Sequence, residues 1–341
     1  MFAKSKNDSK LASMDTIFVT GAFGFIGSNL TERLLKNGYR VIAADRPYAD
    51  MAPLTKRRFD YFSQGFPEIE LFDLRSLDSC RNALLKYSPT TVFHLAALPG
   101  IRPSFDFPRD YWETNLNGTL NIIESTNNSS VRTIFLASSS SVYGSTFKGQ
   151  KSKESDRIDL PVSPYAATKA AMEMMASSLA SSLNLRIISL RFFTVFGPYG
   201  RPDMAVWKFT KALLLGEEIT LNGDGSQLRD FTPIFELLTK LERLLDLSKK
   251  ESNFANMSAI NLGSGSPSSI LELVDSLSNR LNVTPRLNFG GSVLGDVFET
   301  RSHVALQEKI GLTAVSSDAM AKGLDLWVDW CLRNVDLIKS Y

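Results

Sequence analysis

A short apolar segment that leads directly into a glycine turn constrains the fold of this chain most. Thr16 to Thr20 (TIFVT) has the pattern of a buried strand, GAFGFIG follows it, and SNLTERLLKNGY has helical spacing. Glycines tighten such a turn and let the backbone approach a pyrophosphate, which unpaired N–H groups at the helix start stabilise. We therefore expect a first βαβ unit with dinucleotide contacts from Gly21, Gly24, Phe25, Ile26 and Gly27.

The next strand pattern, YRVIAAD, ends in a carboxylate that can select the cofactor. Asp45 lies at the distance from the turn at which a carboxylate binds the ribose hydroxyls of adenosine, and it would repel the 2′-phosphate of NADP. Arg46, directly after it, reduces that preference. The sequence thus favours NAD, and a glycine turn without a ligand is the alternative interpretation.

Four more buried-strand patterns alternate with helical spacing, at Glu70 to Leu74, Thr91 to Ala96, Arg132 to Ala137 and Leu185 to Leu190. This alternation predicts an α/β fold with a Rossmann-type doubly wound parallel sheet and a smaller C-terminal substrate-binding lobe. Ligands of such sheets bind at the carboxyl ends of the strands. Further cofactor contacts are therefore expected from Arg46, Asp73, Leu74, Leu95, Ala96, Ala97, Ser138 and Phe192. His94 falls inside a predicted strand and is expected to be a core histidine.

The chain is longer than a usual single domain, since it has 341 residues. We expect a flexible leader at residues 1–15 and an NAD-binding domain at 16–193, to which a segment near 229–264 returns. Residues 194–228 and 265–341 would form a nucleotide-sugar-binding lobe.

The residue counts argue against several classes of function. The chain has 38 Lys and Arg against 36 Asp and Glu and no long basic run, so nothing indicates a nucleic acid or a membrane surface as partner. Two cysteines and two histidines argue against a disulfide framework and against a His-rich metal site. Neither a membrane-span pattern nor the apolar centre of a signal peptide is present, and we expect a cytoplasmic protein.

The segment SPYAATK places a phenol and an ammonium on one helical face. Tyr165 and Lys169 are four residues apart, about one turn of a helix. A solvated pair on a helix would give the same pattern. In a dinucleotide fold, a nearby ammonium and a cationic nicotinamide would lower the pKa of the phenol, and a serine at a strand end could share the proton of a substrate hydroxyl.

Together, the glycine turn, the strand-end serines of LASSSSVYG and YAATK resemble the extended short-chain dehydrogenase/reductases, the nucleotide-sugar epimerases and dehydratases. The resemblance covers nearly the whole chain after residue 15, and RFFTVFGPYGRPDM is similar to the segment typical of UDP-glucuronate 4-epimerases. It implies a catalytic set of Ser139, Tyr165 and Lys169, an Asn115 that braces the active-site helix and also contacts NAD, and a homodimer formed through helices at 111–125 and 164–183. Tyr165 and Lys169 would contact the cofactor, and Ser139 and Tyr165 would also contact the substrate.

The same resemblance gives meaning to the two serines that follow Ser139. Dehydratases and decarboxylases of the family carry acidic residues around this position, where this chain has Ser140 and Ser141. Without those acids, elimination lacks its acid/base pair, whereas hydroxyls can still bind a substrate carboxylate. Ser140, Ser141 and Thr194 are the expected carboxylate ligands, Thr194 because it stands where glucose epimerases usually have Asn.

Arginines after residue 200 are expected to bind the diphosphate. By the resemblance, Arg201 and Arg229 contact uridine diphosphate, while Arg102 could equally be a surface arginine. Asp203 is either a substrate contact or the cap of a helix that begins at Met204. The chain departs from the family pattern at three positions, Phe235, Ser302 and His303.

The sequence thus predicts an NAD-dependent 4-epimerase that converts UDP-glucuronate to UDP-galacturonate through a 4-keto intermediate. A UDP-glucose or UDP-N-acetylglucosamine 4-epimerase would use the same catalytic residues. The same fold would also serve a dehydratase, a decarboxylase or a non-catalytic NAD-binding protein. The missing acids argue against a dehydratase or a decarboxylase, and the intact catalytic set argues against a non-catalytic protein.

Overall fold

The computed structural model of the chain describes residues 15–250, 257–291, 297–312 and 318–341. Its contacts divide the chain into two compact units. The first unit contains residues 15–98, Trp112–Ala137 and Met172–Ile188, and the second contains Pro99–Tyr111, Ser138–Ala171 and Ser189–Tyr341. These ranges differ from those expected for an NAD-binding domain and a sugar-binding lobe, and that functional division stays a prediction. Fourteen of the fifteen residues of the expected leader, 1–14, lie outside the described residues.

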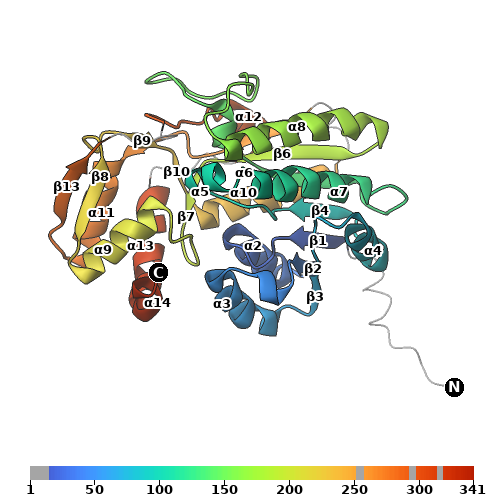
Figure 1. Cartoon of the computed structure of the whole chain (residues 1–341), viewed down its shortest axis with the longest axis horizontal. Coiled ribbons are helices and arrows are strands. Elements are labelled where there is room, and N and C mark those ends of the chain that lie inside the picture. The colour runs from blue at the N-terminus through green and yellow to red at the C-terminus, as the bar shows by residue number, and fades with distance from the viewer. Residues whose placement is uncertain (1–14, 251–256, 292–296, 313–317) are drawn as a thin grey trace. The chain divides into compact units, whose positions relative to one another are not determined.

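The central sheet has seven strands in the order β11-β6-β5-β4-β1-β2-β3. Strand β1 (Thr16–Thr20) pairs in parallel with β2 (Arg40–Asp45) on one side and with β4 (Thr91–His94) on the other. The sheet continues outward in one direction through β3 (Glu68–Leu71) and in the other through β5 (Thr133–Ser139), β6 (Arg186–Phe192) and β11 (Ala259–Leu262). The order therefore reverses between β1 and β4, which is the switch point of a doubly wound Rossmann-type sheet. The predicted fold class is confirmed (Figure 1).

Two strands end earlier than the sequence pattern predicts, and side chains accept backbone N–H groups just beyond their ends. Strand β4 stops at His94, and the backbone N–H of Ala96 donates to the Thr20 hydroxyl at 3.2 Å. The predicted strand at 70–74 is β3 at Glu68–Leu71, followed by a turn in which Asp73 accepts from the Arg75 N–H at 2.9 Å. Residues expected at the cofactor edge thus lie in the loops directly after the strands.

His94 is a core histidine, as expected, although it is the last residue of β4 and not an internal one. Its side chain is 1% exposed, with Nδ1 at 2.8 Å from the Thr20 hydroxyl and Nε2 at 3.1 Å from the Thr119 hydroxyl. Both ring nitrogens have partners in the core, so this imidazole serves structure and not catalysis.

The core of the first unit lies between the sheet and its helices. These are α2 (Phe25–Lys36), α3 (Pro53–Phe62), α4 (Leu77–Tyr87) and α7 (Gly118–Glu124). Buried residues from strands and helices share one cluster, including Phe18, Val92, Leu84 and Ile122. Apolar side chains of α4, α7 and α8 (Pro164–Ser182) supply the helix side of this cluster.

Much of the second unit consists of helices packed beside a short two-stranded sheet (Figure 1). Strand β8 (Glu218–Asn222) pairs in parallel with β13 (Arg286–Gly290), and helices α9 (Ala205–Leu215), α11 (Ile270–Leu281) and α13 (Ala319–Arg333) lie around them. Trp207 of α9 packs against Trp327 and Trp330 of α13, with ring centroids 5.6 and 5.9 Å away. The large buried areas of these rings contribute strongly to the packing of α9 against α13.

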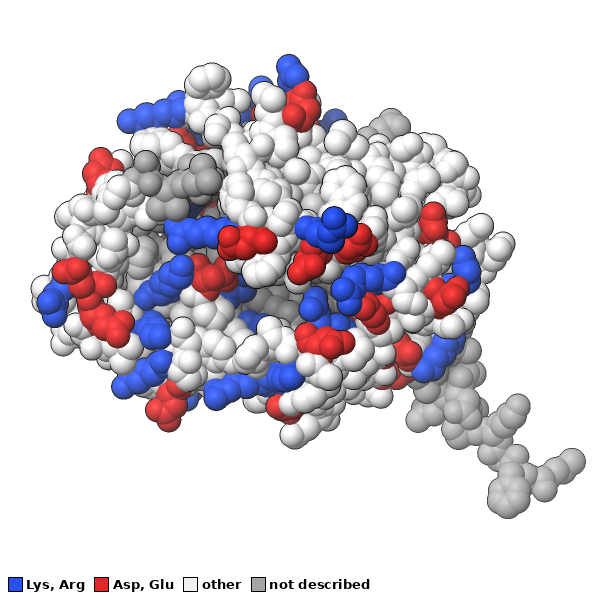
Figure 2. Space-filling model, viewed as in Figure 1, with Lys and Arg blue, Asp and Glu red and all other residues white. Residues whose placement is uncertain are grey.

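The remaining elements are mostly short. The helices are η1 (Tyr48–Asp50), η2 (Ser63–Gly65), α5 (Ile101–Asp106), α6 (Pro108–Tyr111), η3 (Trp112–Asn117), η4 (Ser140–Tyr143), α8 (Pro164–Ser182), α10 (Ile234–Ser248), α12 (Ala305–Lys309) and α14 (Val335–Lys339). The strands are β7 (Thr194–Phe196), β9 (Leu228–Arg229), β10 (Phe231–Pro233) and β12 (Ser268–Ser269). Among the described residues, the helices are all too short or too polar to cross a membrane. On the face drawn in Figure 2, Lys and Arg side chains are interspersed with Asp and Glu.

Candidate active site

The glycine turn of the first unit is closed by contacts that leave no room for side chains. Gly21 has φ +69°, and a Cβ built there would lie 2.7 Å from the backbone nitrogen of Ala96. A Cβ on Gly27 would lie 2.0 Å from the carbonyl oxygen of Gly21. Helix α2 begins at Phe25, three residues earlier than its pattern predicts, and its N-cap Gly24 offers no side-chain cap. The turn therefore presents a bare backbone and a helix N-terminus, which suit a pyrophosphate.

Asp45 is held in a fixed orientation at the end of β2. Its two carboxylate oxygens accept the backbone N–H groups of Phe23 at 2.9 Å and of Arg46 at 2.8 Å. Burial raises the pKa of this carboxyl, while the two backbone hydrogen bonds and Arg46 oppose the rise. A carboxylate fixed in this way one strand from the glycine turn fits the ribose of a dinucleotide.

The other residues expected at the cofactor differ in what they offer. Asp73 pairs with Arg75 at 2.6 Å, and this partner holds the pKa of the carboxyl below its usual value. The Leu74 side chain is buried in the core and its carbonyl accepts from Asn121 at 2.9 Å. Leu95, Ala96 and Ala97, directly after β4, are partly exposed. The leucines and alanines can contribute backbone groups and apolar surface, but no charge.

Asn115 forms a two-point clamp on the segment after β4. Its side chain accepts from the Leu98 N–H at 2.7 Å and donates to the Leu98 carbonyl at 3.1 Å. The residue is 1% exposed and lies in η3, a single stretch of π-helix, a conformation that often marks functional sites. These two bonds fix the loop after β4, whereas the family resemblance predicts that Asn115 braces the active-site helix.

The serine run turns away from β5 at its last residue. Ser138 is buried at 3% exposure, and Ser139 ends the strand. The Ser139 Oγ accepts two hydrogen bonds from Ser141, from the N–H at 3.2 Å and from the hydroxyl at 2.9 Å. Ser140 and Ser141 are partly exposed in η4. The serine run therefore forms a hydrogen-bonded turn at the end of β5.

Tyr165 and Lys169 lie on α8, as the spacing predicts. The Lys169 ammonium is 5.9 Å from the centroid of the Tyr165 ring, and Lys169 is 3% exposed. Burial raises the pKa of Tyr165, whereas Arg201 and a hydrogen bond from Ser139 act to lower it. The second unit alone therefore brings Ser139, Tyr165 and Lys169 together, in an arrangement that can move a proton to and from a substrate hydroxyl.

A second tyrosine, which no sequence pattern singles out, supports the Tyr165 ring. Tyr111 packs edge-on against it with centroids 6.2 Å apart, and its hydroxyl donates to the Pro99 carbonyl at 2.6 Å. Burial raises the pKa of Tyr111 to about 12, so this phenol stays protonated at neutral pH. Tyr111 thus supports the Tyr165 ring. It is the last residue of the short helix α6 (Pro108–Tyr111), and an aromatic there carries no sequence signal for that role.

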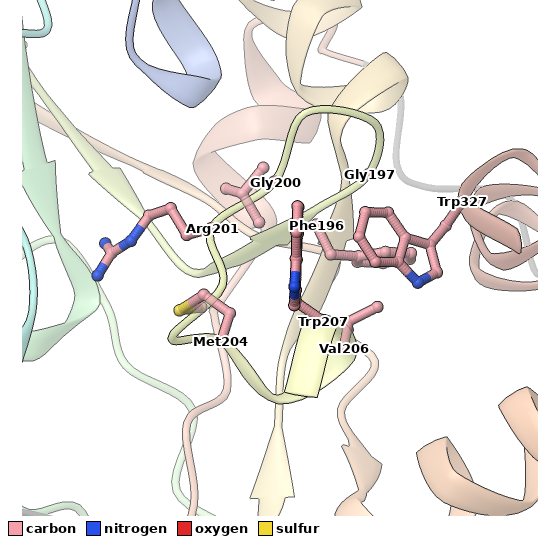
Figure 3. A pocket seen from close by; sticks show the side chains of 9 residues that line it. Phe196, Gly197, Gly200, Arg201, Met204, Val206, Trp207 and Trp327 are labelled. Atoms are coloured by element: carbon pink, nitrogen blue, oxygen red, sulfur yellow. The ribbon is translucent and has the colours of Figure 1, made fainter. Parts of the chain in front are cut away.

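Arg201 and Asp203 form an ion pair before α9. The Arg201 Nε donates to Asp203 at 2.9 Å, and a second bond joins its Nη2 to the other carboxylate oxygen. The interpretation of Asp203 as a helix cap is wrong, because Met204 is the N-cap of α9 and no side chain caps it. Arg201 belongs to the lining of a small cavity beside Trp207 and Trp327, but its side chain extends away from these rings (Figure 3).

The other expected substrate residues are more scattered. Arg229 donates to the carbonyls of Leu228 at 2.8 Å and Phe298 at 3.2 Å. Thr194 opens β7 and is partly exposed, Phe192 ends β6 and is buried, and Arg102 is exposed on α5.

A buried carboxylate next to Arg229 binds one of the three residues at which the chain departs from the family pattern. Asp230 is fully buried and accepts from Ser302 through its N–H at 2.9 Å and its hydroxyl at 2.6 Å, and from the Ser264 hydroxyl at 2.6 Å. His303 donates its N–H to the Ser152 carbonyl, and Phe235 lies 5.3 Å from the Lys322 ammonium. The serine at 302 is therefore a ligand of Asp230, a long-range contact that the sequence pattern did not reveal.

The residues present fit NAD. A Cβ at Gly21 or Gly27 would fill the space of the glycine turn, and the Asp45 carboxylate is held in orientation by the Phe23 N–H of the same turn. Within the described ranges, no group of three or more His, Cys, Asp and Glu side chains could hold a metal ion.

The chain is similar to known proteins over nearly its full length. The UDP-glucuronate 4-epimerase of Thermodesulfobacterium geofontis is 32% identical over 96% of this chain and 99% of that protein. The UDP-glucuronic acid 4-epimerase of Bacillus cereus, solved with UDP-glucuronic acid and NAD, is 29% identical with a TM-score of 0.83, covering 94% of this chain and 99% of that chain. MoeE5 with UDP-glucose and NAD is 35% identical with a TM-score of 0.80, covering the same shares. MoeE5 has also been solved with UDP-glucuronic acid and NAD.

The model of the NAD dependent epimerase/dehydratase family matches residues 17–256. This match covers the glycine turn, Asp45, the serine run and the Tyr165–Lys169 pair, and the structural neighbours share the extended short-chain dehydrogenase/reductase fold. The chain therefore belongs to the NAD dependent epimerase/dehydratase family and is an enzyme that uses NAD.

Proposed function

We propose that this enzyme epimerises a UDP-sugar at C4, and that its substrate is UDP-glucuronate, which it converts to UDP-galacturonate. The observation that carries the proposal is the serine run, in which Ser139 contacts Tyr165 while hydroxyls occupy the two following positions. Oxidation at C4 followed by reduction on the other face needs one proton-transfer group and no second acid/base pair.

Tyr165 is the group that moves the proton. As a phenolate it accepts the proton of the 4-hydroxyl, and it returns a proton to the same oxygen when the 4-keto group is reduced. Burial raises the pKa of Tyr165 above its ordinary value in the protein alone, and Arg201 and Ser139 oppose that rise. The positive charge of bound NAD⁺ would oppose it further. Bound NAD supplies the hydride acceptor and donor for C4, and the sugar must rotate between the two hydride steps.

The choice of glucuronate depends on the groups that would face C5 of the sugar. Ser140 and Thr194 are partly exposed hydroxyls, able to donate to a substrate carboxylate. Neither is a carboxylate, which would repel that substrate. The 4-keto product of glucuronate is a β-keto acid, so holding its carboxylate by hydroxyl donors in a fixed orientation also discourages loss of CO₂.

The similar proteins also support UDP-glucuronate as the substrate. Those named UDP-glucuronate 4-epimerases match over almost the whole chain, and the B. cereus enzyme was solved with UDP-glucuronic acid. UDP-glucose is the second candidate substrate, because the similar MoeE5 was solved with either UDP-sugar.

The test is to incubate the purified protein and NAD with UDP-glucuronate, UDP-glucose or UDP-N-acetylglucosamine and to separate the products. Conversion of UDP-glucuronate to UDP-galacturonate at the highest kcat/KM is expected. Conversion of UDP-glucose alone would overturn the choice of substrate, and a 4-keto-6-deoxy product or a UDP-pentose would overturn the epimerase. Binding of NAD with no conversion of any sugar would indicate a non-catalytic protein.

We also propose that the enzyme is a homodimer formed through α7 and α8. Exposed Met174 on α8 and Trp112 before α7, at 55% and 49% exposure, give these helices apolar surface for a second copy. Light scattering should report twice the mass of 37.8 kDa, and Met174→Glu should lower it to one copy. A monomeric wild-type protein would contradict the dimer.

A further inference from the structure

The serine run contains a chain of hydroxyls directed at the catalytic tyrosine. A serine hydroxyl has one proton and two lone pairs. On Ser139 both lone pairs are occupied by Ser141, through its N–H at 3.2 Å and its hydroxyl at 2.9 Å. The proton of Ser139 is then left to donate elsewhere, and its hydrogen bond reaches Tyr165.

We propose that Ser141 is a positioning residue for catalysis, which fixes the rotation of the Ser139 hydroxyl so that its single proton points at the Tyr165 oxygen. This inference rests on the proposed C4 chemistry, but not on which UDP-sugar is the substrate. It gives Ser141 a different task from the carboxylate binding that the sequence suggested, because a hydroxyl that donates its single proton to Ser139 has none left for a carboxylate.

Fixing this rotation matters because Ser139 must donate and not accept. If the hydroxyl were free to turn, its lone pairs could face the phenolate and repel it. Hydrogen bonds in such a chain also strengthen one another, so donation from Ser141 makes Ser139 a better donor to Tyr165. The backbone N–H of Ser141 supplies one of the two fixed contacts in any variant, whereas the hydroxyl supplies the other only when the side chain can donate.

The charged and titratable groups around Tyr165 act independently of this contact. Lys169 lies on the same helix, Tyr111 packs against the ring, and Arg201 and Asp203 affect the pKa of Tyr165 in opposite directions. All four remain in a Ser141 variant. A change in the pH dependence of that variant therefore reports the Ser139–Tyr165 contact and not a change of local charge.

The experiment compares Ser141→Ala and Ser141→Thr with the wild type in the presence of NAD. We expect Ser141→Ala to lower kcat about tenfold, the effect of losing one ordinary hydrogen bond, and to leave KM unchanged. The rising limb of its pH–rate profile should move to higher pH, because the pKa of Tyr165 rises when Ser139 no longer donates steadily. Ser141→Thr keeps the hydroxyl and should restore both kcat and the pH profile.

A matched control is Ser182→Ala, since the Ser182 hydroxyl donates only within its own helix end, to the Leu179 carbonyl at 2.9 Å, and is exposed. It should have wild-type rates. If Ser141→Ala does not fold, Ser141→Cys replaces it, because a thiol is a weak donor of similar size and is expected to give the same loss of kcat.

Two results would overturn the inference. One is a raised KM for UDP-glucuronate with unchanged kcat and with normal use of UDP-glucose, since that is the result of a lost carboxylate ligand. The other is an equal loss of kcat in Ser141→Ala and Ser141→Thr without a shift of the pH profile, which indicates a packing role. If the wild type does not convert UDP-glucuronate, the proposed substrate is wrong, but the inference about Ser141 is still testable. The Ser141 variants are then compared with the wild type on the UDP-sugar that the wild type converts.

Discussion

The ammonium of Lys169 lies 5.9 Å from the centroid of the Tyr165 ring, one helical turn along α8. Tyr165→Phe removes the hydroxyl that we propose as the acceptor of the substrate proton but keeps the ring and its contact with Tyr111. Its kcat should fall at least about a hundredfold, the usual contribution of a general base. NAD binding, followed by quenching of protein fluorescence, should be unchanged. Turnover at the wild-type rate would exclude Tyr165 as the proton-transfer group.

The Asp203 carboxylate pairs with the Arg201 guanidinium, which we expect to bind the diphosphate, so we expect Asp203 to compete with the substrate for Arg201. Asp203→Asn should therefore bind UDP more tightly, as measured by calorimetry, and Arg201→Ala more weakly. The rising limb of the pH–rate profile should move to lower pH in Asp203→Asn and to higher pH in Arg201→Ala, since Asp203 raises and Arg201 lowers the pKa of Tyr165. Weaker UDP binding by Asp203→Asn would mean instead that Asp203 itself holds the substrate.

The glycine turn should tolerate no side chain at Gly21. Gly21→Ala combines a left-handed φ of +69° with a Cβ 2.7 Å from the Ala96 nitrogen, and should lower the free energy of unfolding by about 1–3 kcal/mol and abolish NAD binding. Gly65→Ala is the matched control, since a Cβ there meets nothing within 4 Å. Urea denaturation and NAD titration measure both variants. Equal behaviour of the two would show that the close approach at Gly21 is not required.

Lys240 should make the protein more stable as the pH rises above neutrality. Its ammonium is buried, donates to the Gly263 carbonyl at 2.8 Å, and has a pKa lowered from 10.5 to about 8 by burial. Between these two values the unfolded chain binds the proton that the folded protein has released, so the free energy of unfolding increases with pH. The full increase is up to about 3 kcal/mol, at about 1.4 kcal/mol per pKa unit.

The measurement is urea unfolding at pH 7 and pH 10 of the wild type and Lys240→Met. The variant has no ammonium at this position, so the difference between the two proteins isolates the contribution of Lys240 from other groups that titrate in this range. The wild type should gain stability relative to Lys240→Met between pH 7 and pH 10. A constant difference at both pH values would mean that Lys240 titrates normally.

The parts of the molecule that the sequence predicted are those set by local patterns. The strand at Thr16–Thr20, the glycine turn and the helix that carries Tyr165 follow from periodicity and turn chemistry, and the alternation of elements then leaves few sheet orders to choose from. Strand ends were less accurate: β4 ends at His94, and beyond it the Ala96 N–H donates to the Thr20 hydroxyl, a contact between residues 76 positions apart.

The contacts that tune the candidate site were not predictable in the same way. The Ser141–Ser139 bond depends on how the chain turns after β5, and Tyr111 meets Tyr165 only through the tertiary fold. Asp230 likewise gathers Ser264 and Ser302 from distant segments. Residue types at these positions are common in any chain, so only the folded geometry identifies them.

The most direct test of the account is a proton NMR time course of UDP-glucuronate with the enzyme and NAD in D₂O. Hydride return to C4 predicts the appearance of UDP-galacturonate, recognised by its equatorial H4, with no deuterium at C4 or C5 and no loss of CO₂. Unchanged UDP-glucuronate, a UDP-pentose, or deuterium incorporated at C5 would contradict C4 epimerisation of this substrate by Tyr165 and NAD.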